Sequence, residues 1–217
     1  MSVFAVVPVK SLLKSKTRLS AVLSPEERRT LTLTMLEDVL TALKSSMADR
    51  ICVISSDSTV QTLAKKFKVE YLSENQPGLN QAIEQAMEWC IHNDAKSVLV
   101  LPADVPLITS EDINQIIKLS SEEPTAVISS SQNGGTNALL QKPPNLIPIC
   151  FGPHSFMKHV GEASAKSVVL KLYTSSRVLL DIDSLEDIKS FLNTESQTVS
   201  RRFLEQISLH NRFLDRP

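Results

Sequence analysis

Glycine is scarce in this chain, which has five glycines among 217 residues and none before Gly78. The phosphate-binding loops GxxxxGK[ST] and GxGxxG need glycines, because there the backbone amides approach the phosphate closely. Neither pattern occurs in the sequence. This absence argues against a P-loop enzyme and against a dinucleotide-binding protein of the usual kind.

Cysteine is also rare. Cys52, Cys90 and Cys150 are odd in number, far apart and set in apolar stretches, so we expect buried free thiols rather than disulfides or a zinc site. His154 and His159 are five residues apart and do not share a helix face, so a metal-binding pair is not expected. The sequence contains no convincing Ser-His-Asp or Cys-His order of the kind that a nucleophilic enzyme has.

Neither sign of charge dominates, with 23 basic and 24 acidic residues, so composition gives no reason to expect nucleic-acid binding. No apolar run approaches the length of a membrane span. The first residues, MSVFAVV, lack the charged start and long apolar centre of a signal peptide. We therefore expect a cytoplasmic protein without a nucleic-acid or membrane partner.

Short β-rich segments alternate with amphipathic helices over residues 3–129, as is typical of a mostly parallel, Rossmann-like α/β sheet with helices on both faces. The expected strands are Val3–Val9, Ile51–Ser55, Val69–Leu72, Ser97–Leu101 and Thr125–Ser129. The expected helices cover residues 25–44, 58–67, 79–92 and 110–119. The first begins with the capping box Ser24-Pro25-Glu26-Glu27.

The pattern changes after Ser130, where we expect a small antiparallel elaboration. It comprises irregular β structure over 136–151, a helix from about Ser155, strands near 168–173 and 178–181, and a helix from Ser184. No linker or repeat divides the chain, so residues 1–217 are interpreted as one domain.

The tail, about residues 195–217, is too small to bury its own apolar side chains. These are Phe203, Leu204, Ile207, Leu209, Phe213 and Leu214. We expect the tail to dock on the body or on a second subunit, and we favour a homodimer.

A cluster of cations, Lys10, Lys14, Lys16 and Arg18, follows the first expected strand without an intervening acid. Ligands of doubly wound folds lie beyond the carboxyl ends of strands, and Lys and Arg bind phosphate by charge. The cluster therefore suits a polyphosphate. The alternative is an ordinary solvated basic loop.

Isolated carboxylates follow two further apolar segments. Asp104 lies between Pro102 and Pro106, and Asp181 and Asp183 flank a single apolar residue. Mg²⁺ is commonly held by one or two carboxylates together with substrate phosphates, and alternate residues of an extended chain project to the same side. The alternatives are that Asp104 caps a turn and that Asp183 or Ser184 caps the next helix.

Two glycine turns could seat a small anion. Gly134-Gly135 is followed by Thr136 and Asn137, and Gly152-Pro153 precedes the helix that begins near Ser155. Most such dipeptides are ordinary turns, which is the alternative. Together with the cations and acids, these turns favour metal-dependent chemistry on a phosphate group.

Six motifs occur in order between residue 6 and about residue 188: VPVKxLxxxKxRL, LSPEER, LPADxPLI, GTNALL, FGPxSF and LDID. This series resembles the 2-phospho-L-lactate guanylyltransferases of coenzyme F420 biosynthesis. The resemblance implies the nucleotide-diphospho-sugar transferase (GT-A-like) fold. The tail after residue 194 lies outside the motif series.

The resemblance implies that GTP and 2-phospho-L-lactate give lactyl-2-diphospho-5'-guanosine and pyrophosphate. Related members use phosphoenolpyruvate or 3-phosphoglycerate-type acids. Two alternatives are a nucleotidyltransferase for a sugar phosphate or a pterin cofactor, and a non-catalytic nucleotide-binding module.

The resemblance also assigns roles to residues. The triphosphate would contact Lys10, Lys14, Lys16 and Arg18, of which Lys10 and Arg18, with Asp104, would be catalytic. Mg²⁺ would be held by Asp104, Asp181 and Asp183. The phospho-acid would be seated by Thr136, Asn137, Gly152 and Ser155. The rest of the nucleotide site would comprise Gly78, Leu79, Asn80, Pro102 and Ala103.

Overall fold

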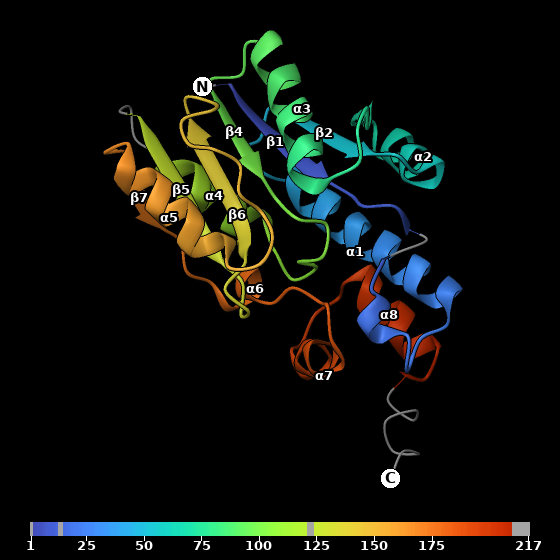
Figure 1. Ribbon diagram of the computed structural model, residues 1–217. Coiled ribbons are helices and arrows are strands. Elements are labelled where there is room, and N and C mark those ends of the chain that lie inside the picture. Colours follow the sequence, from blue (N-terminus) through green and yellow to red (C-terminus); the bar gives the residue numbers. More distant parts are fainter. Residues whose placement is uncertain (1, 13–14, 121–123, 210–217) are drawn as a thin grey trace.

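The computed structural model describes residues 2–12, 15–120 and 124–209. Its centre is a seven-stranded sheet with the strand order β3-β2-β1-β4-β6-β5-β7 (Figure 1). The strands are β1 (Val3–Pro8), β2 (Arg50–Ser55), β3 (Glu70–Ser73), β4 (Ser97–Val100), β5 (Thr125–Ser130), β6 (Thr136–Lys142) and β7 (Val169–Leu172). Strands β1 to β4 run parallel, whereas β6 is antiparallel to both β4 and β5. The expected α/β class with an antiparallel pair is confirmed.

The helices are α1 (Pro25–Lys44), α2 (Ser58–Phe67), α3 (Leu79–His92), α4 (Ser110–Leu119), α5 (Ser155–Ala165), α6 (Ser176–Leu179), α7 (Leu185–Asn193) and α8 (Val199–Gln206), with a 3-10 turn at Thr17–Leu19. Helix α1 starts where the capping box predicts: the Ser24 hydroxyl accepts a hydrogen bond from the Glu27 amide. The Glu27 carboxylate in turn accepts from the Ser24 amide. Local hydrogen bonds thus fix this helix start.

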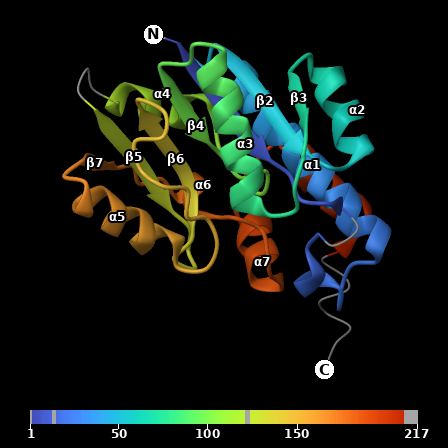
Figure 2. The same cartoon turned by 45° about the horizontal axis from the view of Figure 1, so that its top comes forward.

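Helices cover both faces of the sheet, and alternate residues of β1 therefore enter different cores. Val3, Ala5 and Val7 belong to the cluster that packs against α1, α2 and α4. Phe4 and Val6 belong to the cluster on the α3 and α5 side. Helix α3 packs on β1 and β2, and α5 packs on β5 and β7 (Figure 2). Burial on both faces explains why these strands are apolar throughout.

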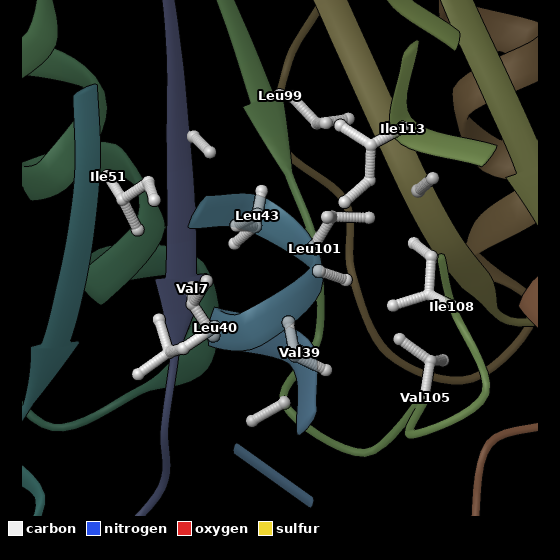
Figure 3. Packing of buried hydrophobic residues seen from close by; sticks show 14 of the residues in the cluster. Val7, Val39, Leu40, Leu43, Ile51, Leu99, Leu101, Val105, Ile108 and Ile113 are labelled. Carbon is white, nitrogen blue, oxygen red and sulfur yellow. The ribbon is translucent and has the colours of Figure 1, made fainter. Parts of the chain in front are cut away.

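Helix α1 supplies much of the packing on its face of the sheet. Figure 3 shows Val39, Leu40 and Leu43 of α1 beside Val7 of β1, with Ile113 of α4 nearby. All five side chains are fully buried. Burying a side chain of this size stabilises a fold by about 1.5–3 kcal/mol. This packing fixes the position of β1, at whose carboxyl end the site is built.

Two expectations for the second half of the chain are wrong. Residues 178–181 do not form a strand, because the short helix α6 covers Ser176–Leu179. The Ser175 side chain caps α6, and Arg177 pairs with buried Asp112 of α4 over 2.7 Å. A short apolar run does not distinguish helix from strand, and here tertiary contacts favour the helix. Strand β7 is also parallel, not antiparallel, to β5.

The described part of the tail, up to Leu209, docks on the body. The carboxylate of Asp38 in α1 accepts hydrogen bonds from the amides of Val199 and Ser200, at 2.7 and 3.0 Å, at the start of α8. Leu204 and Leu209 are buried in a third cluster with residues of α1 and α7. Phe213 and Leu214 lie outside the described residues.

The cysteines are all free, as expected, but only Cys52 and Cys90 are buried. Cys150 is half-buried, because it lies in the irregular segment between β6 and α5 rather than in a packed element. Within the described ranges, no helix is long and apolar enough to cross a membrane.

Candidate active site

A pocket of about 290 Å³ lies beyond the carboxyl ends of β1 and β4. The chain proceeds from β1 to β2 on one side and returns to β4 on the other, so this is the point where the strand order reverses. Ligands of open α/β sheets bind at such points. The charged and apolar residues that line it include Lys10, Lys16, Arg18, Leu79, Asp104 and Asp183. Pro102 and Ala103, which follow β4, also line it.

Lys16 lies at the centre of the pocket's charges. Its Nζ atom donates hydrogen bonds to Asp104 Oδ2 and Asp183 Oδ1, each over 2.6 Å. The lysine side chain is 7% exposed. Burial alone would lower the pKa of Lys16, but the two carboxylates outweigh burial, and the net pKa is raised. Lys16 is therefore a charged bridge between the two acids.

The backbone at Lys16 explains how a loop without glycine makes this turn. Lys16 has a φ of +49°, in the left-handed region that L-residues seldom adopt. The Ser15 amide and hydroxyl both bond the Leu12 carbonyl just before it, and the Leu19 amide bonds the Lys16 carbonyl after it. A left-handed non-glycine residue costs about 1 kcal/mol, and these backbone hydrogen bonds hold Lys16 in that conformation.

The other cations of the loop differ in their surroundings. Lys10 and Arg18 are exposed side chains on the rim of the pocket. Burial raises the pKa of Asp183, but Lys16, Arg18 and Lys10 together bring it below its usual value. The charges of three of the four predicted cations therefore act on the carboxylate of Asp183. Lys14 lies outside the described residues.

Neither Asp104 nor Asp183 caps a helix. Helix α4 is capped by Thr109, and α7 is capped by Ser184 through its hydroxyl. The Ile182 amide donates to the Asp104 carbonyl over 3.0 Å, which ties the loop after β4 to the segment before α7. This backbone bond brings the two carboxylates together although they are far apart in the sequence.

Asp181 is close to this pair but makes a different contact. Its Oδ1 accepts a hydrogen bond from Asn137 Nδ2 over 3.2 Å. Burial, with the nearby carboxylates of Asp104 and Asp183, raises the pKa of Asp181 to about 6. Asp181 and Asp183 therefore hydrogen-bond different partners, Asn137 and Lys16, although their charges act on each other.

The donor set fits a hard divalent cation only in part. In the described portion of the chain, no three potential ligands from His, Cys, Asp and Glu are gathered closely enough to hold a metal ion. Yet Asp104 and Asp183 already direct oxygens at one cation, the Lys16 ammonium. Their negative charges also raise the pKa of the nearby Asp181. Carboxylate oxygens are the ligands that Mg²⁺ prefers. The residues fit such an ion once the ammonium of Lys16 moves away.

The residues predicted to seat the phospho-acid are not among the residues that line this pocket. Thr136 Oγ1 and Ser155 Oγ are 3.1 Å apart, and both side chains are buried. Asn137 instead bonds Asp181 and the Val178 carbonyl. Gly152 has a φ of +127° and open space where a Cβ would lie. Thus the structure joins Thr136 to Ser155, whereas Asn137 turns toward the carboxylates.

The start of α3 borders the other side of the pocket. Gly78 has a φ of +134°, and a Cβ there would collide with the Gln81 side chain. Leu79 lines the pocket. Asn80 Nδ2 donates to the Phe151 carbonyl over 3.1 Å, while its buried Oδ1 has no partner among the described residues. The segment therefore leaves one buried hydrogen-bond acceptor unused.

His159 is the residue of this region that sequence reasoning did not connect to the site. It is fully buried on α5, and its Nδ1 lies 3.0 Å from Thr136 Oγ1. The sequence contained one signal for this contact: Ser155 and His159 are four residues apart and so share a helix face.

Solved structures share this fold. A nucleotide-diphospho-sugar transferase-type chain from Desulfovibrio desulfuricans G20 has a TM-score of 0.81 at 18% identity, covering 98% of this chain and 99% of its own. A nucleotidyl transferase from Methanothermobacter has a TM-score of 0.66 at 13% identity, covering 94% and 99%. The chain therefore has the fold of these nucleotide-diphospho-sugar transferase and nucleotidyl transferase structures.

The sequence narrows this class to one family. The family model described as "Guanylyl transferase CofC like" matches residues 3–216, and the chain belongs to this family. The match includes the tail, which the six motifs had left outside. A phosphoenolpyruvate guanylyltransferase of Rubrobacter xylanophilus is 41% identical over 87% of this chain and 92% of its own. A 2-phospho-L-lactate guanylyltransferase of Methanobrevibacter smithii is 34% identical over 96% and 92%.

Proposed function

We propose that this protein transfers GMP from GTP to the phosphate of 2-phospho-L-lactate, giving lactyl-2-diphospho-5'-guanosine and pyrophosphate. The observation that carries the proposal is the charge arrangement of the pocket. Cations after β1 suit a triphosphate, and Asp104 and Asp183 already hold a cation between them. Several relatives of 34–37% identity carry this enzyme name, among them the protein from Methanobrevibacter smithii.

The chemistry needs no protein nucleophile. An oxygen of the acceptor phosphate attacks the α-phosphorus of GTP and forms a new P–O bond. The bond from the α-phosphorus to the bridging oxygen breaks, and its electron pair leaves with pyrophosphate. A phosphate monoester has its second pKa near 6, so it is largely ionised at neutral pH without a general base. This agrees with the lack of an exposed histidine in the pocket lining.

The protein's task is to bring two anions together in line. Lys10, Lys16 and Arg18 would contact the triphosphate, where they stabilise charge on the departing pyrophosphate. In this arrangement the Lys16 ammonium would give up its hydrogen bonds to Asp104 and Asp183 and bind the phosphates instead. Asp104, Asp181 and Asp183 would then hold Mg²⁺, which supplies positive charge against the α-phosphate and the pyrophosphate.

The guanine would lie beside the start of α3. Asn80 Oδ1 is a buried acceptor without a donor among the described residues. The Phe151 carbonyl can only accept, so it fixes the amide orientation and keeps Oδ1 as the unused atom. Guanine presents an N2 amino group and an N1 hydrogen, both donors, on its Watson–Crick edge. Asn80 is therefore our candidate for base contact.

Phosphoenolpyruvate is a second candidate acceptor. The relative from Rubrobacter xylanophilus, at 41% identity, is named for that substrate, as is one from a Roseiflexus strain at 34%. Both acids carry a carboxylate and a phosphate on the same carbon, and they differ in a methyl group against a methylene. The charged side chains of the site do not distinguish them.

The test is pyrophosphate release by purified protein with Mg²⁺ and GTP, with each acid supplied separately. We expect release with 2-phospho-L-lactate and a product of the mass of the guanosine diphospho-lactate. Greater kcat/KM with phosphoenolpyruvate would favour the second candidate. Release only with a sugar phosphate or a pterin cofactor, or GTP binding without any release, would contradict the proposal. ATP and CTP serve as controls for the base.

A homodimer remains part of the proposal. Phe203 and Ile207 of the tail are only partly buried against the body. Light scattering after size exclusion should give twice the chain mass of 24.0 kDa, and a mass of one chain would contradict a dimer.

A further inference from the structure

A chain of hydrogen bonds links the buried imidazole of His159 to the hydroxyl pair formed by Thr136 and Ser155. The His159 side chain is fully buried. Its Nε2 accepts from the Cys150 amide over 3.0 Å, and its Nδ1 lies 3.0 Å from Thr136 Oγ1. Thr136 Oγ1 in turn lies 3.1 Å from Ser155 Oγ. The T-shaped contact with the Phe151 ring, at 5.1 Å between centroids, holds the imidazole in place.

The backbone determines which tautomer this imidazole adopts. The Cys150 amide can only donate, so Nε2 must carry a lone pair and no proton. Burial, with a smaller contribution from Lys158, lowers the pKa of His159 to about 4, so the ring is neutral at physiological pH. A neutral imidazole carries one proton, which is therefore on Nδ1. His159 thus donates to Thr136 Oγ1.

The tautomer sets the direction of the remaining hydrogen bonds. Thr136 and Ser155 have one hydroxyl hydrogen each, and the bond between them uses one. Because Thr136 accepts from His159, it cannot donate to the ring. One hydroxyl hydrogen of the pair is then left without an acceptor in the described part of the chain. With the opposite tautomer, Thr136 would donate to Nδ1 and no hydrogen would be left.

The first two amides of α5 are already engaged. The Ser155 amide donates to the Gly152 carbonyl over 3.1 Å, and the Phe156 amide donates to the Gly134 carbonyl over 3.2 Å. These two bonds fasten the start of α5 to both glycine turns. The hydroxyl pair, rather than these first amides of the helix, is therefore what can donate to a ligand.

We propose that His159 is a positioning residue that makes the Thr136–Ser155 pair a hydrogen-bond donor to the anionic acceptor substrate. The phosphate and carboxylate oxygens of such an acid are acceptors only, so a donor pair binds them and an acceptor pair repels them. This inference rests on the proposed function, because it takes the hydroxyl pair as part of the acceptor seat.

Two substitutions of similar size separate positioning from packing. In His159→Asn the amide nitrogen reaches the place of Nδ1 and can still donate to Thr136, whereas in His159→Gln the amide lies at the place of Nε2. We expect His159→Gln to raise the KM for the acceptor roughly 10-fold or more, and His159→Asn to rescue most of that loss. The KM for GTP should stay within about 2-fold in both, because His159 does not line the nucleotide pocket.

The tautomer is also observable without catalysis. In ¹⁵N spectra of the full chain with labelled histidine, we expect a signal from an imidazole with protonated Nδ1 and bare Nε2 that disappears in His159→Gln; His92, whose Nδ1 faces the Glu88 carbonyl, gives a signal that stays. A protonated Nε2 in this ring would overturn the proposal. So would equal rises in acceptor KM for the two variants, tracking their stability losses. Wild-type protein that releases no pyrophosphate with any acid would instead overturn the proposed function, and the positioning role with it.

Discussion

At the scale of single residues, Lys16 shows how position decides the role of a cation. Lys10 and Arg18 belong to the same segment after β1, yet they are exposed. Lys16 has a left-handed backbone conformation, and its side chain is buried. Its ammonium lies where a metal ion between Asp104 and Asp183 would lie. Under the proposed function, Mg²⁺ would compete with the lysine for the same oxygens, and a triphosphate that attracts the lysine would favour the metal.

Removing the Lys16 ammonium should strengthen metal binding to the nucleotide-free protein. In Lys16→Met, Asp104 and Asp183 lose their only cation among the described contacts, so a divalent ion meets less competition. We expect Mn²⁺ affinity to rise about 10-fold or more, measured by the free-ion electron paramagnetic resonance signal. Lys10→Met removes an equal charge that acts on Asp183 without hydrogen-bonding either carboxylate, and it is the matched control. Equal Mn²⁺ affinity in wild type and Lys16→Met would refute the competition.

Asp104 should be needed for turnover and not for folding. Asp104→Asn keeps the shape of the side chain but removes the charge, and we expect kcat to fall at least about 100-fold with an unchanged circular dichroism spectrum. Asp94→Asn, at an exposed position after α3, is the control and should retain activity. Substantial turnover by Asp104→Asn would remove Asp104 from the metal site.

At the scale of elements, α8 depends on one carboxylate of α1. The first amides of a helix have no partner within the helix, and here Asp38 accepts those of Val199 and Ser200. Burial raises the pKa of Asp38, although these bonds partly offset it. The docking of the tail is therefore specified by a polar contact as well as by Leu204.

Removing this carboxylate should loosen the tail. We expect Asp38→Ala to lower the free energy of unfolding in urea by about 1–3 kcal/mol, because the part-buried amide of Val199 and the buried amide of Ser200 lose their acceptor. Ser200→Ala, which removes the hydroxyl bonded to Asp38 over 2.5 Å, allows a double-mutant cycle. Strictly additive losses in the double variant would show that the two residues do not act together.

The elements themselves were largely predictable, because their signals are local. The capping boxes at Ser24 and Ser184 mark the starts of α1 and α7, and the apolar runs mark β1 and β4. Helix α6 was not predictable, because its stability depends on Arg177 reaching Asp112, a residue far away in the sequence. The partners of Lys16 were not predictable for the same reason.

At the scale of the whole molecule, the buried imidazole of His159 should link stability to pH. Its folded pKa of about 4 lies below the unfolded value of 6.5, so the unfolded chain binds more protons between these values. Stability from this group is complete above pH 6.5 and is lost as the pH falls toward 4, by up to about 3 kcal/mol. Asp181 acts in the opposite direction, because its folded pKa is raised to about 6.

The difference between wild type and His159→Gln isolates the histidine from the other groups. Urea unfolding at pH 7.5 and pH 4.5 should show a smaller pH-dependent loss in the variant than in the wild type. Identical pH dependence in the two proteins would mean that His159 does not titrate as its burial requires.

The sequence by itself determined most of the helices, the buried strands and the family, because caps, periodicity and ordered motifs are set by residues close together along the chain. Only the tertiary structure decided which charges meet. Lys16 bonds residues 88 and 167 positions away, and His159 orients a hydroxyl 23 positions away. Such contacts depend on the tertiary fold, which brings together the ends of strands from distant parts of the sequence. Hydrogen bonds and ion pairs act over a few ångströms of space, whatever the distance along the sequence.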